Sequence, residues 1–221
     1  MNFFAHAKLA LWRSTDPRFV FGAMLPDLSS MIGVRIKHVD QPELAAGVGF
    51  HYATDAAFHA APSFVAICSN GLATLSEAGV ARGTARAVVH VGTELLLDGV
   101  LADDLSALHA YRRALASATA ERWVKHFELE SAQDPQSFHE ALERLARAPV
   151  PESYRDPGFV SARLRTILGR RPRLAMRESD REGVERFVER LQSDVLAAAP
   201  ALLDQVRTNL DAAQLERRAV Q

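Results

Sequence analysis

Helical periodicity dominates this sequence and constrains the fold more than any other feature. Apolar residues recur at the spacing of an amphipathic helix along most of the chain, and no alternating run of the length expected for a strand appears. Glycine and proline lie mostly between the periodic stretches, where they end helices. The expected helices cover roughly 3–13, 41–59, 62–77, 80–99, 102–127, 135–147, 157–168, 178–197 and 199–217. The sequence therefore predicts an all-α fold, a helical bundle.

Prolines mark the expected helix boundaries, because proline lacks the amide hydrogen that an inner helical turn needs. Pro26 and Pro200 are both predicted to end a helix. The segment Pro149–Pro151 is the weakest seam, where a linker between two helical layers is expected. A chain of 221 residues is long enough for one hydrophobic core, so residues 1–221 are expected to form a single domain.

The charge balance excludes a general affinity for polyanions. The chain carries 26 basic and 27 acidic residues, a formal net charge of −1, so no nucleic acid partner is expected. Its one cysteine, Cys68, cannot form an intrachain disulfide and is typical of a reducing cytosol. The N-terminal apolar stretch is interrupted by His6 and Lys8 and is too short for a signal peptide or a membrane span. We therefore expect a cytoplasmic protein without a membrane span, whose oligomeric state the sequence does not indicate.

Two of the expected helices carry metal-ligand residue types at positions i, i+4 and i+8. The first trio is His51, Asp55 and His59, and the second is His90, Glu94 and Asp98. Each step of four residues advances roughly 400° around an α-helix, so each trio forms one slowly spiralling stripe. Facing stripes of this kind build the metal sites of helical bundles.

The spacing alone is weak evidence for a metal site. The chain has 8 histidines and 27 acidic residues, and chance placement of that many is expected to produce such a trio. A third trio, His126, Glu130 and Asp134, lies beside Arg122 and Lys125 and is interpreted as a solvated helix end. It provides an internal comparison for the other two.

The surroundings of the first two trios set them apart. No Lys or Arg occurs in the segments 38–81 and 87–111, whose other residues are largely apolar. A partly buried carboxylate without a basic partner is costly, and a divalent cation offsets that cost. The alternative is that Asp55, Glu94 and Asp98 are protonated, capped or exposed, and that the histidines are ordinary core residues.

His6 and Asp27 are further candidate ligands. A lone histidine in an apolar helix such as the first one is more often structural, and a carboxylate that follows Pro26 can cap a helix. Mixed histidine and carboxylate ligands favour Mn²⁺, Fe²⁺ or Zn²⁺ over Ca²⁺. A cation of this kind acidifies bound water and neutralises phosphoryl oxygens, so the pattern points to phosphoester hydrolysis.

A run of six arginines extends from Arg163 to Arg177 without an acidic residue between them. One interpretation is a solvated helix end, where cations interact favourably with the helix dipole. The other is a docking surface for phosphate or for an acidic protein, because the guanidinium fork matches both groups. Composition alone leaves both interpretations open.

Four segments of the chain together resemble a known family. They are the opening Met1-Asn2-Phe3-Phe4-Ala5-His6, the turn Gly22…Pro26-Asp27, the run Gly47-Val-Gly-Phe-His51-Tyr-Ala-Thr-Asp55, and the stretch Tyr154-Arg155-Asp156…Ile167-Leu-Gly-Arg170-Arg171-Pro172-Arg173-Leu174. They resemble segments of the acyl carrier protein phosphodiesterases. The resemblance covers most of the chain from Met1 to about Arg177, and its most specific parts are the N-terminal hexapeptide and the Arg-Arg-Pro-Arg-Leu run.

The resemblance implies an all-helical fold related to the HD-type metal phosphohydrolases. It implies a divalent cation, typically Mn²⁺, and hydrolysis of holo-acyl carrier protein to the apo form and 4′-phosphopantetheine. It also implies that four residues match metal-site positions: His6, Asp27, His51 and Asp55. This chain departs from the family in carrying His90 and Glu94 where members carry aspartates. The extension from Asp55 to His59 also differs, and it is similar to helical zinc-dependent phospholipases of bacteria.

The leading hypothesis is a metal-dependent phosphodiesterase that acts on acyl carrier protein. The predicted metal ligands are His6, Asp27, His51, Asp55, His90 and Glu94, with Asp27, His51, His90 and Glu94 at the centre. His59 and Asp98 are predicted to support the ligands or to act as general base, and Arg170, Arg171 and Arg173 to orient phosphate or the carrier protein. Mn²⁺ is favoured, with Zn²⁺ or Fe²⁺ as alternatives. Two other hypotheses are an enzyme for another small phosphoester, such as a phospholipase C-like enzyme, and a non-catalytic helical adaptor.

Overall fold

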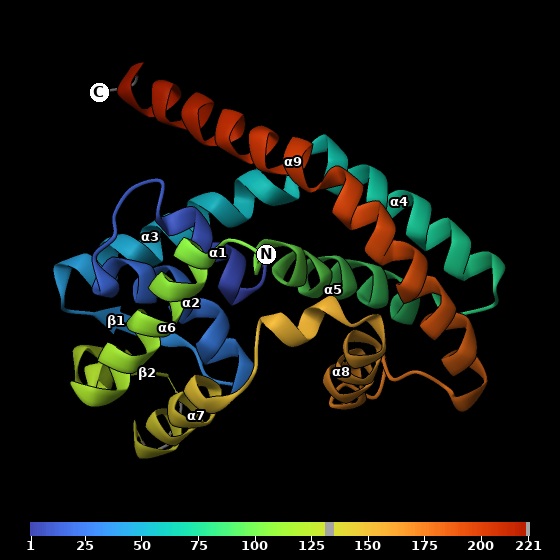
Figure 1. The fold of residues 1–221 in the computed structure, drawn as a ribbon, viewed down its shortest axis with the longest axis horizontal. Helices are drawn as coiled ribbons and strands as arrows, with labels where there is room; N and C mark the ends of the chain where they lie inside the picture. The colour runs from blue at the N-terminus through green and yellow to red at the C-terminus, as the bar shows by residue number, and fades with distance from the viewer. Residues whose placement is uncertain (131–134, 220–221) are drawn as a thin grey trace. The chain divides into compact units, whose positions relative to one another are not determined.

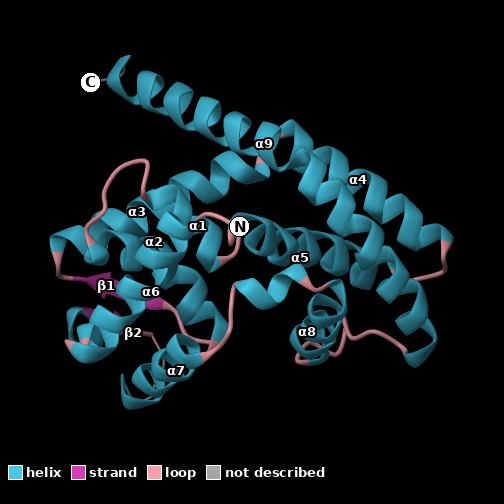
Figure 2. Ribbon diagram, viewed as in Figure 1, coloured by secondary structure: helices cyan, strands magenta, loops and turns pink. Residues whose placement is uncertain are grey.

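The computed structural model describes residues 1–130 and 135–219, and it confirms the all-α prediction (Figures 1 and 2). The α-helices are α1 (Phe3–Ala10), α2 (Pro17–Met31), α3 (Pro42–His59), α4 (Pro62–Glu77), α5 (Arg82–Leu101), α6 (Leu105–Ala120), α7 (Pro135–Arg147), α8 (Pro157–Gly169) and α9 (Arg181–Ala219). The other elements are the 3₁₀ turns η1 (Trp123–His126), η2 (Glu152–Arg155) and η3 (Glu178–Asp180), and the strands β1 (Ile36–Val39) and β2 (Phe127–Leu129).

The chain forms two compact units. The first unit comprises residues 1–55 and 101–150, and the second comprises 56–100 and the chain from Pro151 onward. One of the unit boundaries falls between Val150 and Pro151. The expectation that the chain is a single domain with a seam at 149–151 stays a prediction.

Helix α1 forms the centre of the first unit's core and packs against α2 and α6. Seven of its eight residues are buried, as expected for a helix that is apolar on all sides. Phe4 contacts Tyr111 of α6 edge to face, with ring centroids 5.4 Å apart. Because α1 is enclosed in this way, its one histidine, His6, is also fully buried.

Helix α2 is absent from the helices expected from the sequence, which leave out residues 14–40. The prediction that a helix ends at Pro26 is wrong, because Pro26 lies inside α2. The Asp16 side chain caps the helix by accepting a hydrogen bond from the backbone N–H of Arg18 at 2.7 Å. Pro26 removes one backbone hydrogen bond, but Phe21, Leu25 and other apolar residues along the helix are buried, and this packing maintains the helix beyond the proline.

Helices α2 and α3 approach each other closely through two glycines. A Cβ atom at Gly22 would lie 2.3 Å from the carbonyl oxygen of Leu44, and one at Gly47 would lie 2.3 Å from the carbonyl oxygen of Phe19. Only hydrogen atoms fit at these two positions, so the two backbones are in direct contact. This crossing brings the carbonyl of Ala23 next to the side chain of His51, one turn beyond Gly47 on α3.

Strands β1 and β2 form an antiparallel pair in the first unit, shown in magenta in Figure 2. They are too short to give an alternating pattern, which is why the sequence did not indicate them.

Helix α6 ends at Ala120, so the expected helix over 102–127 is too long. His126 is the last residue of η1, and its Nδ1 lies 3.2 Å from Oδ1 of Asp40. Glu130 follows β2, so the interpretation that His126 and Glu130 share one helix end is wrong. Asp134, the last residue of that trio, lies outside the described residues.

The second unit packs α4, α5, α8 and α9 together. A Cβ atom at Gly92 of α5 would lie 3.3 Å from Leu191 of α9 and 3.5 Å from Leu164 of α8. The prediction that a helix ends at Pro200 is wrong, because α9 continues through it. Val195 and Leu202, on either side of Pro200, are fully buried, so apolar packing maintains the helix despite the missing hydrogen bond. Among the described helices, none has the length and apolar character needed to cross a bilayer.

Candidate functional site

Three predicted metal ligands meet in the first unit. His6 of α1, Asp27 of α2 and His51 of α3 each offer a ligand atom, and these atoms all lie within 4.8 Å of one another. His6 is fully buried and His51 is 5% exposed, while the Asp27 side chain is 26% exposed. The imidazole rings of His6 and His51 are tilted by 31° relative to each other, with centroids 3.9 Å apart. This group is called the first ligand group below.

The hydrogen bonds of the two Nδ1 atoms indicate which nitrogen of each ring carries the proton. Nδ1 of His51 lies 2.9 Å from the carbonyl oxygen of Ala23, which only accepts, so this nitrogen carries the proton. The hydroxyl of Thr54 donates to a backbone carbonyl, that of Phe50 or His51, each at 2.9 Å. Its oxygen therefore accepts from Nδ1 of His6 at 3.0 Å. In the neutral form of each histidine the lone pair is then on Nε2, the atom that His6 presents to Asp27 at 3.7 Å.

Burial lowers the pKa of His51, and this effect outweighs its hydrogen bond to Ala23 and the negative charge of Asp55. The ring is therefore neutral at physiological pH. Neutral imidazole is the form that binds metal ions. Two imidazoles and one carboxylate fit Mn²⁺, Fe²⁺ or Zn²⁺, the cations expected from the sequence.

Asp55 lies at the edge of the first ligand group. Its Oδ1 is 3.9 Å from Nε2 of His6 and accepts a hydrogen bond from the amino group of Met1 at 2.8 Å. The side chain is 35% exposed, so it faces solvent more than the three ligands do. All four residues that the family resemblance assigned to the metal site therefore lie together in the first unit.

A second set of ligand atoms meets in the second unit, and we call it the second ligand group. His59, the last residue of α3, lies beside His90 and Glu94 of α5. Nε2 of His90 is 3.0 Å from Oε1 of Glu94 and 3.1 Å from Nε2 of His59. From the sequence, His59 was predicted to support the ligands or to act as general base. In the structure it directly contacts two ligand-type residues.

Glu94 is ionised in this group. Burial acts to raise the pKa of its carboxyl, but nearby positive charge and hydrogen bonds from the rings of His59 and His90 hold the pKa well below its usual range. Phe64 packs edge-on against both rings, with centroids 5.2 Å from each. The two imidazoles are therefore fixed in orientation by apolar packing.

Asp98 lies one turn beyond Glu94 on α5 and is fully buried. Burial, with a smaller contribution from the Asp98 charge, raises the pKa of Tyr154 to about 12, against the opposing effect of Arg163. Within residues 1–130 and 135–219, neither ligand group includes Asp98. Its predicted catalytic role stays a prediction. The sequence also predicts that a single cation is held mainly by Asp27, His51, His90 and Glu94, and this stays a prediction.

A pocket of about 330 Å³ opens beside the second ligand group. Its walls include His59, His90, Phe64, Arg86 and Cys68. Burial, with a further contribution from a nearby carboxylate, raises the pKa of the Cys68 thiol to about 11, so it stays protonated at neutral pH. The sequence does not indicate Phe64 or Arg86 as site residues, because neither has a local motif that links it to the histidines.

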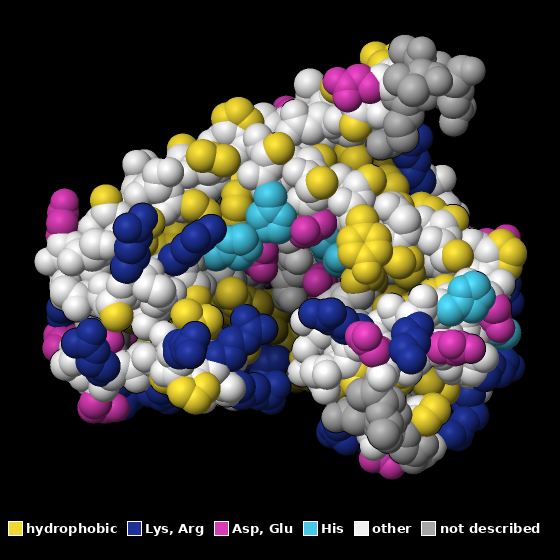
Figure 3. All heavy atoms as spheres, turned by 180° about the vertical axis from the view of Figure 1, so that it is seen from behind, with side chains coloured by type: hydrophobic (Ala, Val, Ile, Leu, Met, Phe, Trp, Pro, Cys, Tyr) yellow, Lys and Arg dark blue, Asp and Glu magenta, His cyan; other side chains and the backbone are white. Residues whose placement is uncertain are grey.

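The predicted arginine surface follows the end of α8 in the second unit. Arg170, Arg171 and Arg173 are all exposed, and Figure 3 shows Lys and Arg side chains gathered over this part of the molecule. Arg171 donates its backbone N–H to the carbonyl of Leu168 at 2.9 Å, which tightens the end of the helix. The side chains of all three arginines therefore reach solvent.

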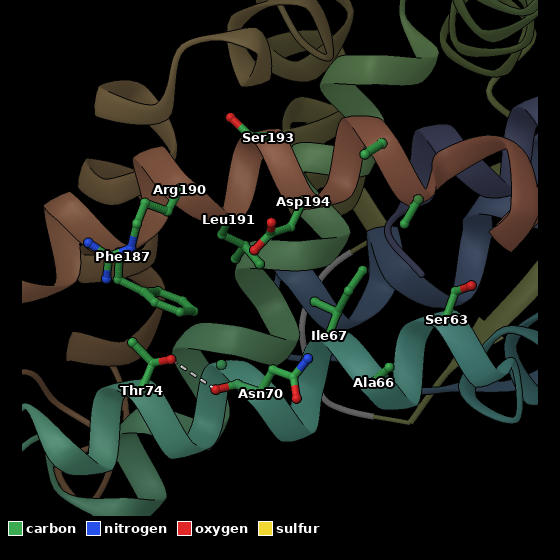
Figure 4. Close-up of a pocket in the computed structure, with 13 residues that line it drawn as sticks. Ser63, Ala66, Ile67, Asn70, Thr74, Phe187, Arg190, Leu191, Ser193 and Asp194 are labelled. Carbon is green, nitrogen blue, oxygen red and sulfur yellow. Dashed lines mark hydrogen bonds between the residues drawn. The ribbon is translucent and has the colours of Figure 1, made fainter.

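A wider groove of about 700 Å³ lies between α4 and α9 (Figure 4). Asn70 and Thr74 line one wall, and Phe187, Arg190 and Asp194 line the other. None of the site residues expected from the sequence lines this groove. It is therefore a separate feature of the second unit.

These observations define a helical protein with histidine–carboxylate groups of the type that binds divalent cations. The model of the acyl carrier protein phosphodiesterase family matches residues 1–202 of the 221. The chain belongs to the acyl carrier protein phosphodiesterase family, whose name indicates a phosphodiesterase and hence a hydrolase. No curated protein and no solved structure matches the chain.

Proposed function

We propose that the protein is a phosphodiesterase that depends on a divalent metal ion and releases 4′-phosphopantetheine from holo-acyl carrier protein. The membership in the family supports the reaction and the substrate. The first ligand group supports the metal dependence. The observation that carries it is the pair of hydrogen bonds from Nδ1 of His6 and His51 to Thr54 and Ala23, because they leave both Nε2 lone pairs for a cation.

His6, Asp27 and His51 would hold the cation, with Asp55 beside them. When bound, a divalent cation acidifies water and neutralises charge on phosphoryl oxygens. The protein's own part is to hold the two rings in one position. The Ala23 carbonyl and the Thr54 hydroxyl fix both rings before substrate arrives, so little reorganisation is needed during the reaction.

The arginines after α8 would dock the carrier protein. Arg170, Arg171 and Arg173 are exposed, and no acidic residue occurs between Arg163 and Arg177 to neutralise them within this segment. A guanidinium group binds carboxylates through two parallel hydrogen bonds. This surface therefore suits an acidic protein partner.

The decisive experiment measures release of 4′-phosphopantetheine from holo-acyl carrier protein. Chelator-treated protein should be inactive, and added Mn²⁺ should restore activity. His51→Ala should lower kcat/KM by at least about 100-fold, since it removes a metal ligand. His126→Ala is the matched control, because His126 pairs with Asp40 and belongs to neither ligand group. If metal-loaded wild-type protein leaves holo-acyl carrier protein intact, the proposal is wrong.

A further inference from the structure

The second ligand group brings three ligand atoms to one place. Three atoms form a triangle: Nε2 of His59, Nε2 of His90 and Oε1 of Glu94. The sides are 3.0 Å between His90 and Glu94, 3.1 Å between the two histidines, and 3.5 Å between His59 and Glu94. Each atom is therefore within hydrogen-bonding reach of both others.

All three atoms can offer a lone pair to the centre of this triangle. Each ring does so in the tautomer that carries its proton on Nδ1, and the carboxyl oxygen of Glu94 has lone pairs of its own. The two Nε2 atoms lie 3.1 Å apart, so both rings direct the same atom to one place.

The separations between these three atoms are those of ligands around a single cation. Ligand bonds of about 2.0–2.2 Å place neighbouring ligand atoms roughly 2.8–3.6 Å apart in octahedral or tetrahedral sites. The three observed separations, 3.0, 3.1 and 3.5 Å, match this range. The atoms are therefore already spaced as metal ligands.

We propose that His59, His90 and Glu94 form a second divalent-metal site, selective for Zn²⁺ and similar transition ions over Mg²⁺ and Ca²⁺. Two imidazoles with one carboxylate favour such ions, whereas Mg²⁺ and Ca²⁺ prefer oxygen ligands. The site is additional to the cation proposed for the first ligand group. It does not depend on the phosphodiesterase activity of the protein.

The surroundings have the other features that a metal site needs. Phe64 holds both rings in place by edge-on packing, and the rings themselves stack with centroids 4.9 Å apart. The adjoining pocket of about 330 Å³ gives the ion a path to solvent and room for a further ligand. Arg86 in the same pocket adds a positive charge, which favours an anion such as phosphate as that further ligand.

The test is a Zn²⁺ titration of metal-free, full-length protein by calorimetry. The wild type should bind two Zn²⁺ ions per chain. His59→Ala and the isosteric Glu94→Gln should each weaken one of the two sites by more than about 100-fold and leave the other unchanged. His51→Ala should weaken only the other site, and His126→Ala should weaken neither. Circular dichroism of each metal-free variant checks that it is folded.

The results separate this proposal from the proposed function. If folded Glu94→Gln and His59→Ala bind Zn²⁺ with wild-type stoichiometry and affinity, the second site does not exist, whatever the enzyme's activity. If His51→Ala keeps both ions, the metal assignment of the first ligand group fails while the second site stands. A wild type that binds a single ion, lost in His51→Ala, overturns the second site only.

Discussion

The hydroxyl oxygen of Thr54 lies 3.0 Å from Nδ1 of His6, although 48 residues separate the two in the chain. Both groups are buried, so this one contact decides which nitrogen of His6 carries its proton. The metal-binding character of His6 is therefore set by a residue that binds no metal itself.

Replacing Thr54 with valine should weaken the first ligand group without removing a ligand. The variant keeps the shape of the side chain but leaves the buried N–H of His6 without its acceptor, which costs about 1–3 kcal/mol in unfolding free energy. Metal affinity should fall about 10–100-fold. Thr54→Ser keeps the hydroxyl and should retain most of the affinity. Metal titration and thermal melting measure both effects, and wild-type affinity in Thr54→Val would contradict the tautomer assignment.

Replacing Gly22 with alanine should destabilise the first unit. The added Cβ would lie 2.3 Å from a backbone oxygen of α3, so the two helices must separate. The shift would also move the Ala23 carbonyl away from His51 and lower metal affinity. Gly49→Ala is the matched control on α3, because a Cβ there meets nothing within 4 Å. We expect Gly49→Ala to raise stability slightly, by up to about 1 kcal/mol. Equal melting temperatures for the two variants would refute the close crossing.

Asp104 should make the first unit sensitive to acid. It caps α6, and its hydrogen bonds with Lys8 and with the backbone N–H of Ala107 lower its pKa to about 2. A group whose pKa is lowered by folding stabilises the protein above its unfolded pKa, about 3.9, and loses this effect as the pH falls toward 2. Asp104→Ala should lower stability at pH 7 by about 0.5–2 kcal/mol and have less effect near pH 2. Urea unfolding at both pH values measures the change in the free energy of unfolding. An equal loss of stability at pH 7 and pH 2 would contradict the lowered pKa of Asp104.

Charge reversal of Arg170, Arg171 and Arg173 distinguishes the roles of the arginine surface. If these residues dock an acidic carrier protein, the triple glutamate variant should associate more slowly with it, and the rate should depend less on salt. Hydrolysis of a small soluble phosphodiester should change much less. If both activities collapse, the arginines bind the reacting phosphate. If neither changes, they are only a solvated helix end. Stopped-flow association at several salt concentrations provides the measurement.

The sequence predicts some of the helices that begin at a proline, although it misses α2, which begins at Pro17. Helices α4 and α7 occupy the expected ranges, and each starts at its proline, Pro62 or Pro135. The same residue type misleads at Pro26 and Pro200, because burial on both sides of each proline maintains the helix. Periodicity alone does not reveal that burial, since it depends on which helices pack together.

The ligand residues are predictable as residue types, but their grouping is not. His51 and His59 occur on one helical stripe, yet eight residues turn them roughly 80° apart and separate them by about 12 Å along the axis. They therefore belong to different ligand groups. The partners that orient His6 and His51 lie 48 and 28 residues away, so only the packed structure identifies them.

The contact between Gly22 and Gly47 also limits how this protein can evolve. The two positions meet backbone to backbone, and a larger side chain at either one forces α2 and α3 apart. Random mutagenesis under selection for metal binding should therefore leave both positions as glycine while nearby surface positions of α3, such as Gly49, change freely. Selection for metal binding should thus also preserve the distance between α2 and α3.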